Sequence, residues 1–364
     1  MTTALAISGG GSKGAFAVGV IEYLVNTAHL DFDVYAGTST GAMIVPLLAA
    51  GVPGAIDTLH HLYTTVRKQD IVVERQPALA LNDYGWFETT PAWNNLITKY
   101  VTPDVFNRLQ TGKKIALFVT QNLPSGRTVY WQIGGTTGPI RVTDAEFAEV
   151  RVIPDLDTLR RAILASGSMP VIMRSIEVPY QAGMNALYCD GGVRQYAPIQ
   201  IALDAGADHV YAVVLSPPWQ NRAPCQDDLS NLINLLQRSI DLLTGQVGDG
   251  NIQLAGLYTR AAQYADAVVG ALRDRLVGQG GVSADVFDAA LASVQAQSPF
   301  TGPTARLTVI RPDSELVDSQ GKAVDTLTFD GPTMESWLQR GAQIASKTPL
   351  DPDAGVRVPT QPVA

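Results

Sequence analysis

Two strand–turn–helix units follow one another at the start of this chain and limit the folds open to it. Residues 5–7 have strand character and lead into the glycine turn GGGSKG at 9–14, after which residues 15–25 carry apolar groups at helical spacing. Residues 32–50 repeat this order, with the tight turn GTSTG at 37–41 between a strand and a helix. Two such units in succession predict an α/β fold with a mostly parallel central sheet.

The composition suits a large sheet that is buried on both faces. Hydrophobic residues make up 46% of the 364 residues and charged residues 16%, which is typical of such a sheet. The net charge of -8 argues against a nucleic-acid partner, because such proteins carry a basic surface for phosphates. Cys189 and Cys225 are too few for a disulfide framework or a Cys-rich zinc site. The sequence predicts no metal and no cofactor, and it predicts no particular oligomeric state.

The N-terminal residues bear on where the protein resides. Strand-like residues begin at Leu5, which leaves no room for a signal peptide. No uninterrupted apolar run approaches the length that spans a bilayer. We expect a soluble cytoplasmic protein, with secretion that needs no cleaved signal left open.

The rest of the chain predicts one domain, residues 4–346, with two insertions and a flexible tail. The insertions lie at about 65–110, which is rich in aromatic residues, and at about 226–297, which is helical; the tail of 347–364 contains several prolines. Further elements of the sheet and its helices are expected as a hairpin at 115–121 and 128–133, helices at 156–166 and 199–205, and strands at 186–189, 210–215 and 308–310.

The first glycine motif is open to three interpretations. Gly9, Gly11 and Gly14 meet the Gly-x-Gly-x-x-Gly spacing of a dinucleotide site, but no acidic residue closes the second strand as that site requires. A phosphate loop is excluded because Lys13 is followed by glycine instead of Ser or Thr. Consecutive glycines before a helix expose backbone N–H groups that suit an oxyanion. Oxyanion binding and a purely structural turn therefore both stay open.

The second and third motifs supply a candidate nucleophile and a candidate base. Ser39 sits between Gly37 and Gly41, as a serine on a nucleophile elbow does, although it would equally cap the following helix. We expect none of the histidines, at positions 29, 60, 61 and 209, to have a glycine turn or a carboxylate as its partner. Asp190 follows an apolar strand and precedes two glycines, which suits a general base or a turn-forming Asp-Gly pair.

These motifs resemble the patatin-like phospholipase family, which carries a Gly-Gly-Gly-x-Lys/Arg-Gly turn, a Gly-x-Ser-x-Gly elbow and an Asp-Gly-Gly/Ala base motif. The segments 165–170 and 310–312 and Pro198 resemble it too, so the resemblance covers about residues 4–346. The chain departs from the family where many members have asparagines before the proline, since it has Tyr196 and Ala197 there.

The resemblance implies a three-layer α/β/α fold with helical insertions and a Ser-Asp dyad. It implies Ser39 as the nucleophile, Asp190 as the base, Gly10 and Gly11 as oxyanion donors and Lys13 as a nearby positive charge. The supporting motif residues are Gly9, Lys13, Gly14, Gly37, Gly41, Gly191 and Gly192.

The implied activity is that of a lipid acyl hydrolase, of phospholipase A or lysophospholipase type, acting as a serine esterase through an acyl-enzyme. Its substrates would be phospholipid, lysophospholipid or another acyl-ester lipid, reached by transient contact with a membrane surface. An acyltransferase using the same dyad and a catalytically idle binding module are the alternatives. The aromatic segment 84–93 would either line or cover an acyl channel, or pack the insertion's own core.

Overall fold

The computed structural model describes residues 1–75, 85–135, 138–181, 184–222, 230, 232–295, 305–322 and 326–350. Its strands are β1 (Thr3–Ile7), β2 (Val34–Thr38), β3 (Val73–Glu74), β4 (Phe87–Glu88), β5 (Ile115–Asn122), β6 (Thr128–Gly134), β7 (Ala148–Val152), β8 (Ile176–Gln181), β9 (Met184–Asp190), β10 (His209–Val213) and β11 (Arg306–Ile310).

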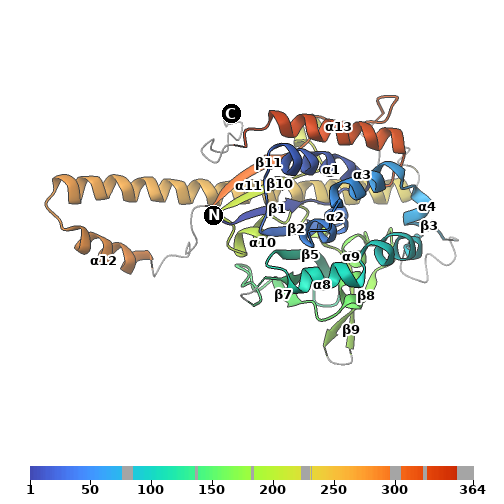
Figure 1. Ribbon diagram of the computed structural model, residues 1–364, viewed down its shortest axis with the longest axis horizontal. Coiled ribbons are helices and arrows are strands. Elements are labelled where there is room, and N and C mark those ends of the chain that lie inside the picture. The colour runs from blue at the N-terminus through green and yellow to red at the C-terminus, as the bar shows by residue number, and fades with distance from the viewer. Residues whose placement is uncertain are drawn as a thin grey trace.

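The helices surround the central strands, and α11 projects far beyond them (Figure 1). The α-helices are α1 (Gly14–Glu22), α2 (Thr40–Ala49), α3 (Ala55–Thr65), α4 (Lys68–Ile71), α6 (Thr90–Ala92), α7 (Thr98–Tyr100), α8 (Pro103–Thr111), α9 (Leu156–Ser166), α10 (Ile199–Asp204), α11 (Leu232–Arg273), α12 (Ala284–Gln295) and α13 (Gly331–Lys347). Short 3₁₀ helices are η1 (Gly11–Lys13), η4 (Gly191–Val193) and η5 (Trp219–Asn221), and π-helical turns are η2 (Tyr23–Thr27), η3 (Trp93–Ile97) and η6 (Asp274–Gln279).

The main sheet has the strand order β11-β10-β1-β2-β5-β6-β7, and the hairpin of β8 and β9 joins it through β5. Strands β11, β10, β1, β2 and β5 are mutually parallel, whereas β6 and β9 pair antiparallel with β5. Parallel strands end at one edge of a sheet, which is where ligands bind in open α/β sheets. The glycine turn after β1 and the elbow after β2 therefore share one edge.

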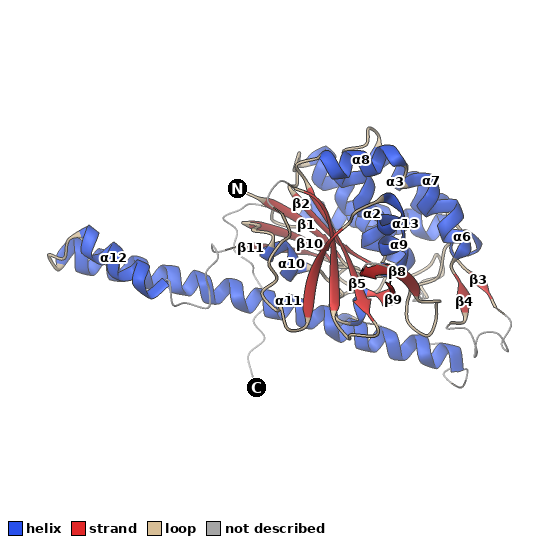
Figure 2. Cartoon of the chain, turned by 90° about the horizontal axis from the view of Figure 1, so that it is seen from below, coloured by secondary structure: helices blue, strands red, loops and turns tan. Residues whose placement is uncertain are grey.

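Alternating residues of the strands pack into two hydrophobic cores, one on each face of the sheet. Leu5 and Ile7 of β1 pack with α1, α2, α9 and α13, whereas Ala4 and Ala6 pack with α10 and with Ala255 of α11. Figure 2 shows α10 and α11 on one side of the strands and α2, α9 and α13 on the other. This arrangement confirms the predicted three-layer α/β/α fold with a mostly parallel sheet.

Several expected elements form with small shifts in their bounds, and others were not predicted. The hairpin at 115–133 is present as β5 and β6, inside the main sheet. The helix predicted at 156–166 coincides with α9. Strands β7 and β8 and helix α13 were not predicted. Helix α13 packs against α1 and α3 and completes that layer.

The two predicted insertions differ in kind. Residues 65–110 hold short helices and the two-residue strands β3 and β4. Residues 226–297 hold the long helix α11 and, at its far end, α12 (Figure 1). Tyr84, Cys225 and residues 351–364 of the predicted tail lie outside the described residues, and the domain bounds of 4–346 stay a prediction. Within the described ranges, no helix combines the length and apolar character needed to cross a membrane.

Candidate active site

Ser39 occupies the sharp turn between β2 and α2. Its backbone has φ 56° and ψ -119°, a conformation that a non-glycine residue seldom adopts. A Cβ on Gly41 would lie 2.4 Å from the Ile7 carbonyl oxygen, so this turn packs too closely for a side chain there. The Ser39 side chain makes no capping hydrogen bond to α2, although it is the residue at the N-cap. The helix-cap interpretation is therefore wrong, and the hydroxyl is free for another partner.

The glycine turn after β1 leaves two backbone donors available. Gly10 and Gly11 have φ of 151° and 57°, values that favour glycine. The flanking donors are used: the Gly9 N–H bonds the Tyr196 carbonyl at 3.0 Å and the Ser12 N–H bonds the Thr326 carbonyl at 2.9 Å. Among the described residues, no acceptor takes the N–H of Gly10 or Gly11.

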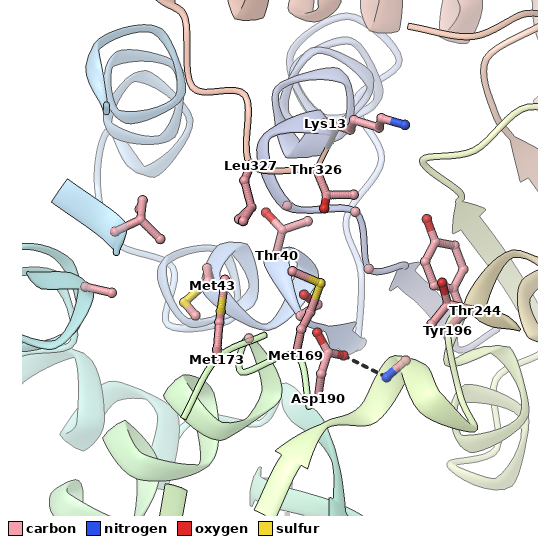
Figure 3. A pocket seen from close by; sticks show the side chains of 18 of the residues that line it. Lys13, Thr40, Met43, Met169, Met173, Asp190, Tyr196, Thr244, Thr326 and Leu327 are labelled. Atoms are coloured by element: carbon pink, nitrogen blue, oxygen red, sulfur yellow. Dashed lines mark hydrogen bonds between the residues drawn. The ribbon is translucent and has the colours of Figure 1, made fainter. Parts of the chain in front are cut away.

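Asp190 is the last residue of β9, and it lines the same cavity as Ser39, Gly10 and Gly11. Its Oδ1 accepts the Gly192 N–H at 2.7 Å (Figure 3), and its own N–H donates to the Ser168 carbonyl at 2.8 Å. Burial raises the pKa of Asp190 to about 6, against the lowering effect of the Gly192 N–H and of a hydrogen bond with the Ser39 side chain. The Ser39 side chain therefore lies close enough to the Asp190 carboxylate to lower its pKa, although 151 positions (190 minus 39) separate the two residues.

The last residue of α9 and the residues after it connect the serine elbow with Asp190. The Ser166 Oγ accepts the Ser39 N–H at 2.9 Å and donates to the Val119 carbonyl at 2.6 Å. Two residues later, the Ser168 carbonyl accepts the Asp190 N–H. In the sequence, this segment is marked only by its resemblance to the family. Its two serines carry no separate signal, because their partners come from distant strands.

Lys13 lies beside the site but is directed elsewhere. Its Nζ is 3.7 Å from Glu315 Oε2, and in Figure 3 its side chain points away from Asp190. Both side chains of this ion pair are largely buried and line the same cavity as Ser39. Of the supporting glycines, Gly14 begins α1, while Gly191 and Gly192 form η4 directly after Asp190.

Ser39 and Asp190 line a cavity of about 470 Å³, a volume within the usual range for small-molecule sites. One part of its lining is apolar and comes from α2, α3, η3 and α9; another is polar and comes mainly from α11, from Arg222 directly after η5 and from the residues around Lys13. The apolar residues include Met43, Leu47, Leu59, Leu62, Leu96, Ile97 and Ile163, and the polar ones include Lys13, Arg222, Arg238, Asp241, Thr244 and Glu315.

Trp86, Phe87 and Trp93 of the aromatic segment 84–93 do not line this cavity, although Tyr100 later in the same insertion does. Phe87 is buried in a separate cluster with Val72, Ile172 and Leu327, and Trp93 packs against the main core. The smaller side chains that follow, such as Leu96 and Ile97, line it instead. Of the two roles considered for the aromatic residues, the packing role fits Phe87 and Trp93.

The histidines lie away from the cavity, whose described lining includes none of them. His60 is 3.3 Å from Glu22 and 3.4 Å from Glu335 on the surface, so the expectation that no histidine has a carboxylate partner is wrong for His60. Its carboxylates come from α1 and α13, which sequence proximity does not indicate. Within the described ranges, no group of three or more His, Cys, Asp and Glu side chains is arranged to hold a metal ion.

Comparisons with known proteins support the expected relationship. A family model described as patatin-like phospholipase matches residues 5–203, more than half of the chain. The cUMP-AMP-activated phospholipase of Escherichia coli is 42% identical over 64 residues, which cover 16% of this chain and 19% of that protein. The uncharacterized protein YjjU of E. coli K12 is 24% identical over 244 residues, which cover 64% of this chain and 60% of that protein. The alignments thus span less than two thirds of the length of either relative.

The structure of VipD from Legionella pneumophila aligns with 95% of this chain and 66% of that one, at a TM-score of 0.38 and 13% identity. The assignment rests on the family model, whose matched residues include the glycine turn, the serine elbow and the aspartate motif. The chain belongs to the patatin-like phospholipase family.

Proposed function

We propose that this protein is a lipid acyl hydrolase that cleaves carboxylic esters with Ser39 as the nucleophile and Asp190 as the general base. The observation that carries the proposal is that Ser39 and the buried Asp190 line one largely apolar cavity, where the serine side chain is near enough to the carboxylate to affect its pKa. A carboxyl group with a pKa of about 6 is ionised at neutral pH yet basic enough to accept a proton.

The reaction would proceed in two halves. The Ser39 Oγ attacks the ester carbonyl carbon while its proton passes to an Asp190 carboxylate oxygen, giving a tetrahedral intermediate. The N–H groups of Gly10 and Gly11 stabilise its negative oxygen, each for about 3 kcal/mol. The carbon–oxygen bond to the alcohol then breaks and the alcohol takes the proton from Asp190. In the second half, Asp190 takes a proton from water as the water attacks the acyl-enzyme, and the carboxylic acid leaves while Ser39 regains its proton.

The two kinds of lining suggest how a lipid binds. The apolar part, built around Leu47, Leu59 and Ile97, suits an acyl chain. The polar part, with Arg222, Arg238 and Glu315, suits a headgroup or glycerol. Phospholipids and lysophospholipids therefore fit the site in one orientation, with the ester near Ser39. The name of the E. coli relative, a phospholipase, agrees with this substrate class.

Exposed apolar side chains near the cavity suit brief contact with a lipid surface. Trp219 and Leu242 line the cavity and are 58% and 38% exposed, and the neighbouring Leu243 is 65% exposed. A tryptophan and leucines at such a rim favour the interface between water and lipid.

The proposal is tested by incubating the purified chain with mixed phospholipid and lysophospholipid micelles and measuring free fatty acid by mass spectrometry. Ser39→Ala is the key variant, because alanine keeps the Cβ and so keeps the same backbone strain. Ser125→Ala, in the turn between β5 and β6, is its control. We expect fatty acid release by wild type and the control and none above background by Ser39→Ala. Equal release by all three chains would refute the assignment of Ser39.

A further inference from the structure

Tyr196 stands between the glycine turn and helix α11. Its carbonyl oxygen accepts the Gly9 N–H at 3.0 Å. Its ring packs so closely on Gly9 that a Cβ there would lie 3.3 Å from it, and a Cβ on Gly192 of the base loop would lie 3.7 Å away. The ring thus touches the segments on either side of the proposed dyad.

Helix α11 supports Tyr196 from behind. A Cβ on Gly248 of α11 would lie only 2.6 Å from the Tyr196 ring, so the helix approaches the ring through a residue without a side chain. The Asn251 Oδ1 of the same helix accepts the Ala197 N–H at 3.3 Å. One turn earlier, Thr244 lines the cavity on the side of Tyr196 (Figure 3). The helix therefore holds residues 196 and 197 by two contacts while forming part of the cavity wall.

The surroundings of the phenol keep it fixed and neutral. Tyr196 is only 9% exposed, and burial raises its pKa to about 12 against the effect of the nearby Ser8 and Ser216 hydroxyls. Ser8 itself accepts the Leu215 N–H and donates to the Gly9 carbonyl. The Tyr196 ring thus packs together with the residues that follow β1 and β10, at the position just before Gly10 in the glycine turn.

We propose that Tyr196, backed by Gly248, is a positioning residue that sets the direction of the Gly10 and Gly11 N–H groups. The inference rests on the proposed function, because those groups matter only if an oxyanion forms there. Tyr196 stands where many family members carry an asparagine. Its ring fills the space between the glycine turn and α11, which comes close to the ring at Gly248. A shift of the ring would turn Gly9 and the two following amides directly, whereas Ser39 and Asp190 are held independently by Ser166 and by the Ser168 carbonyl.

Gly248→Ala tests this inference, with Gly250→Ala as the matched control. Both glycines lie on α11, but a Cβ on Gly250 meets no atom within 4 Å. We expect Gly248→Ala to lower kcat by about 10-fold to 100-fold, as misplacement of catalytic groups does, with KM changed less than about twofold. Gly250→Ala should match wild type. The acidic limb of the pH profile should stay in place in both, because Asp190 does not move.

A double-mutant cycle with Tyr196→Leu separates a positioning role from general damage to α11. Leucine leaves room for a methyl group at position 248, so Gly248→Ala should cost little further kcat in that background. Tyr196→Leu alone should lower kcat with KM nearly unchanged, which also serves if Gly248→Ala fails to fold. Equal loss from Gly248→Ala in both backgrounds, or wild-type kcat in Tyr196→Leu, would overturn the inference. If wild type itself hydrolyses no ester or Ser39→Ala retains full activity, the proposed function fails and this inference fails with it.

Discussion

The hydroxyl of Ser166 accepts a hydrogen bond from the backbone N–H of Ser39 over 2.9 Å. It also donates to the Val119 carbonyl, so one buried side chain joins the elbow after β2 to strand β5. A strained turn persists only where its surroundings fix it. Ser166 is one of the groups that fix the elbow.

Ser166→Ala should therefore affect both stability and catalysis. The change leaves the Ser39 N–H and the Val119 carbonyl without this partner, which costs about 1–3 kcal/mol for a buried donor or acceptor. We expect lower stability in denaturant and a fall in kcat of about tenfold as the elbow loosens. Ser168→Ala is the control, since among the described residues the Ser168 hydroxyl bonds only the Leu164 carbonyl one turn back. Equal kcat in the two variants would show that Ser166 has no special role.

The activity should depend on pH through Asp190. The carboxylate must be ionised to accept the serine proton, so kcat/KM should fall as pH drops through about 6. Above that value the profile should be flat until another group titrates. The measurement is kcat/KM for a soluble ester between pH 4 and 9. An acidic limb near pH 4, the value of an ordinary carboxyl group, would contradict the buried environment assigned to Asp190.

Removing the charge of Asp190 should stabilise the fold at neutral pH. The pKa of this carboxyl is raised in the folded state, so the folded chain binds its proton more tightly than the unfolded chain. The Asp190 carboxyl group therefore contributes most to stability below about pH 4, the pKa of this group in the unfolded chain. That contribution is lost as the pH rises through about 6, its pKa in the folded chain. A pKa raised from about 4 to about 6 corresponds to about 3 kcal/mol.

Asp190→Asn should thus unfold at higher denaturant than wild type at pH 8, and the advantage should disappear below pH 4. Asparagine keeps an oxygen that accepts the Gly192 N–H. Asp157→Asn, an exposed carboxylate beside Arg161, is the control and should change stability little at either pH. If Asp190→Asn were less stable than wild type at pH 8, burial of the Asp190 charge would not be the main effect of this residue on the free energy of unfolding.

The exposed rim of the cavity should matter for lipid at an interface and not for soluble esters. Trp219→Ser and Leu243→Ser remove exposed apolar surface, so we expect lower hydrolysis of phospholipid vesicles and weaker sedimentation with them. Hydrolysis of a short soluble ester should stay within about twofold of wild type for Leu243→Ser, whose side chain is not part of the cavity lining, and should fall less than vesicle hydrolysis for Trp219→Ser, which lines it. Val286→Ser on α12, also well exposed but remote, is the control. Equal loss on both substrates would mean that these side chains shape the cavity instead.

The fold followed from local signals wherever the chain repeats strand, turn and helix. The two opening units and the helix 156–166 have their own periodicity and turn residues. Helix α13 had a signal that was not used, because Asp330 caps it through the Thr333 N–H and Pro332 follows in its first turn. Strand β8 pairs only with β9, a pairing that no local pattern of apolar residues specifies.

The sequence indicates those residues of the candidate site that stand in a motif, and it does not indicate the residues that support them. Ser39 and Asp190 stand in recognisable glycine settings. Ser166 and Tyr196 act through contacts with Ser39 and Gly9 that depend on register and helix packing. Lys13 was expected only as a charge near the turn, and its pairing with Glu315 joins residues about 300 positions apart.

The most direct test of the dyad is to locate the residue that a fluorophosphonate modifies. The probe reacts with a serine whose proton a neighbouring base removes, and peptide mass spectrometry identifies the site. We expect modification at Ser39 in wild type at pH 8, and a rate at least about 100-fold lower in Asp190→Asn. Modification of a different serine, or equal rates in the two chains, would contradict the dyad.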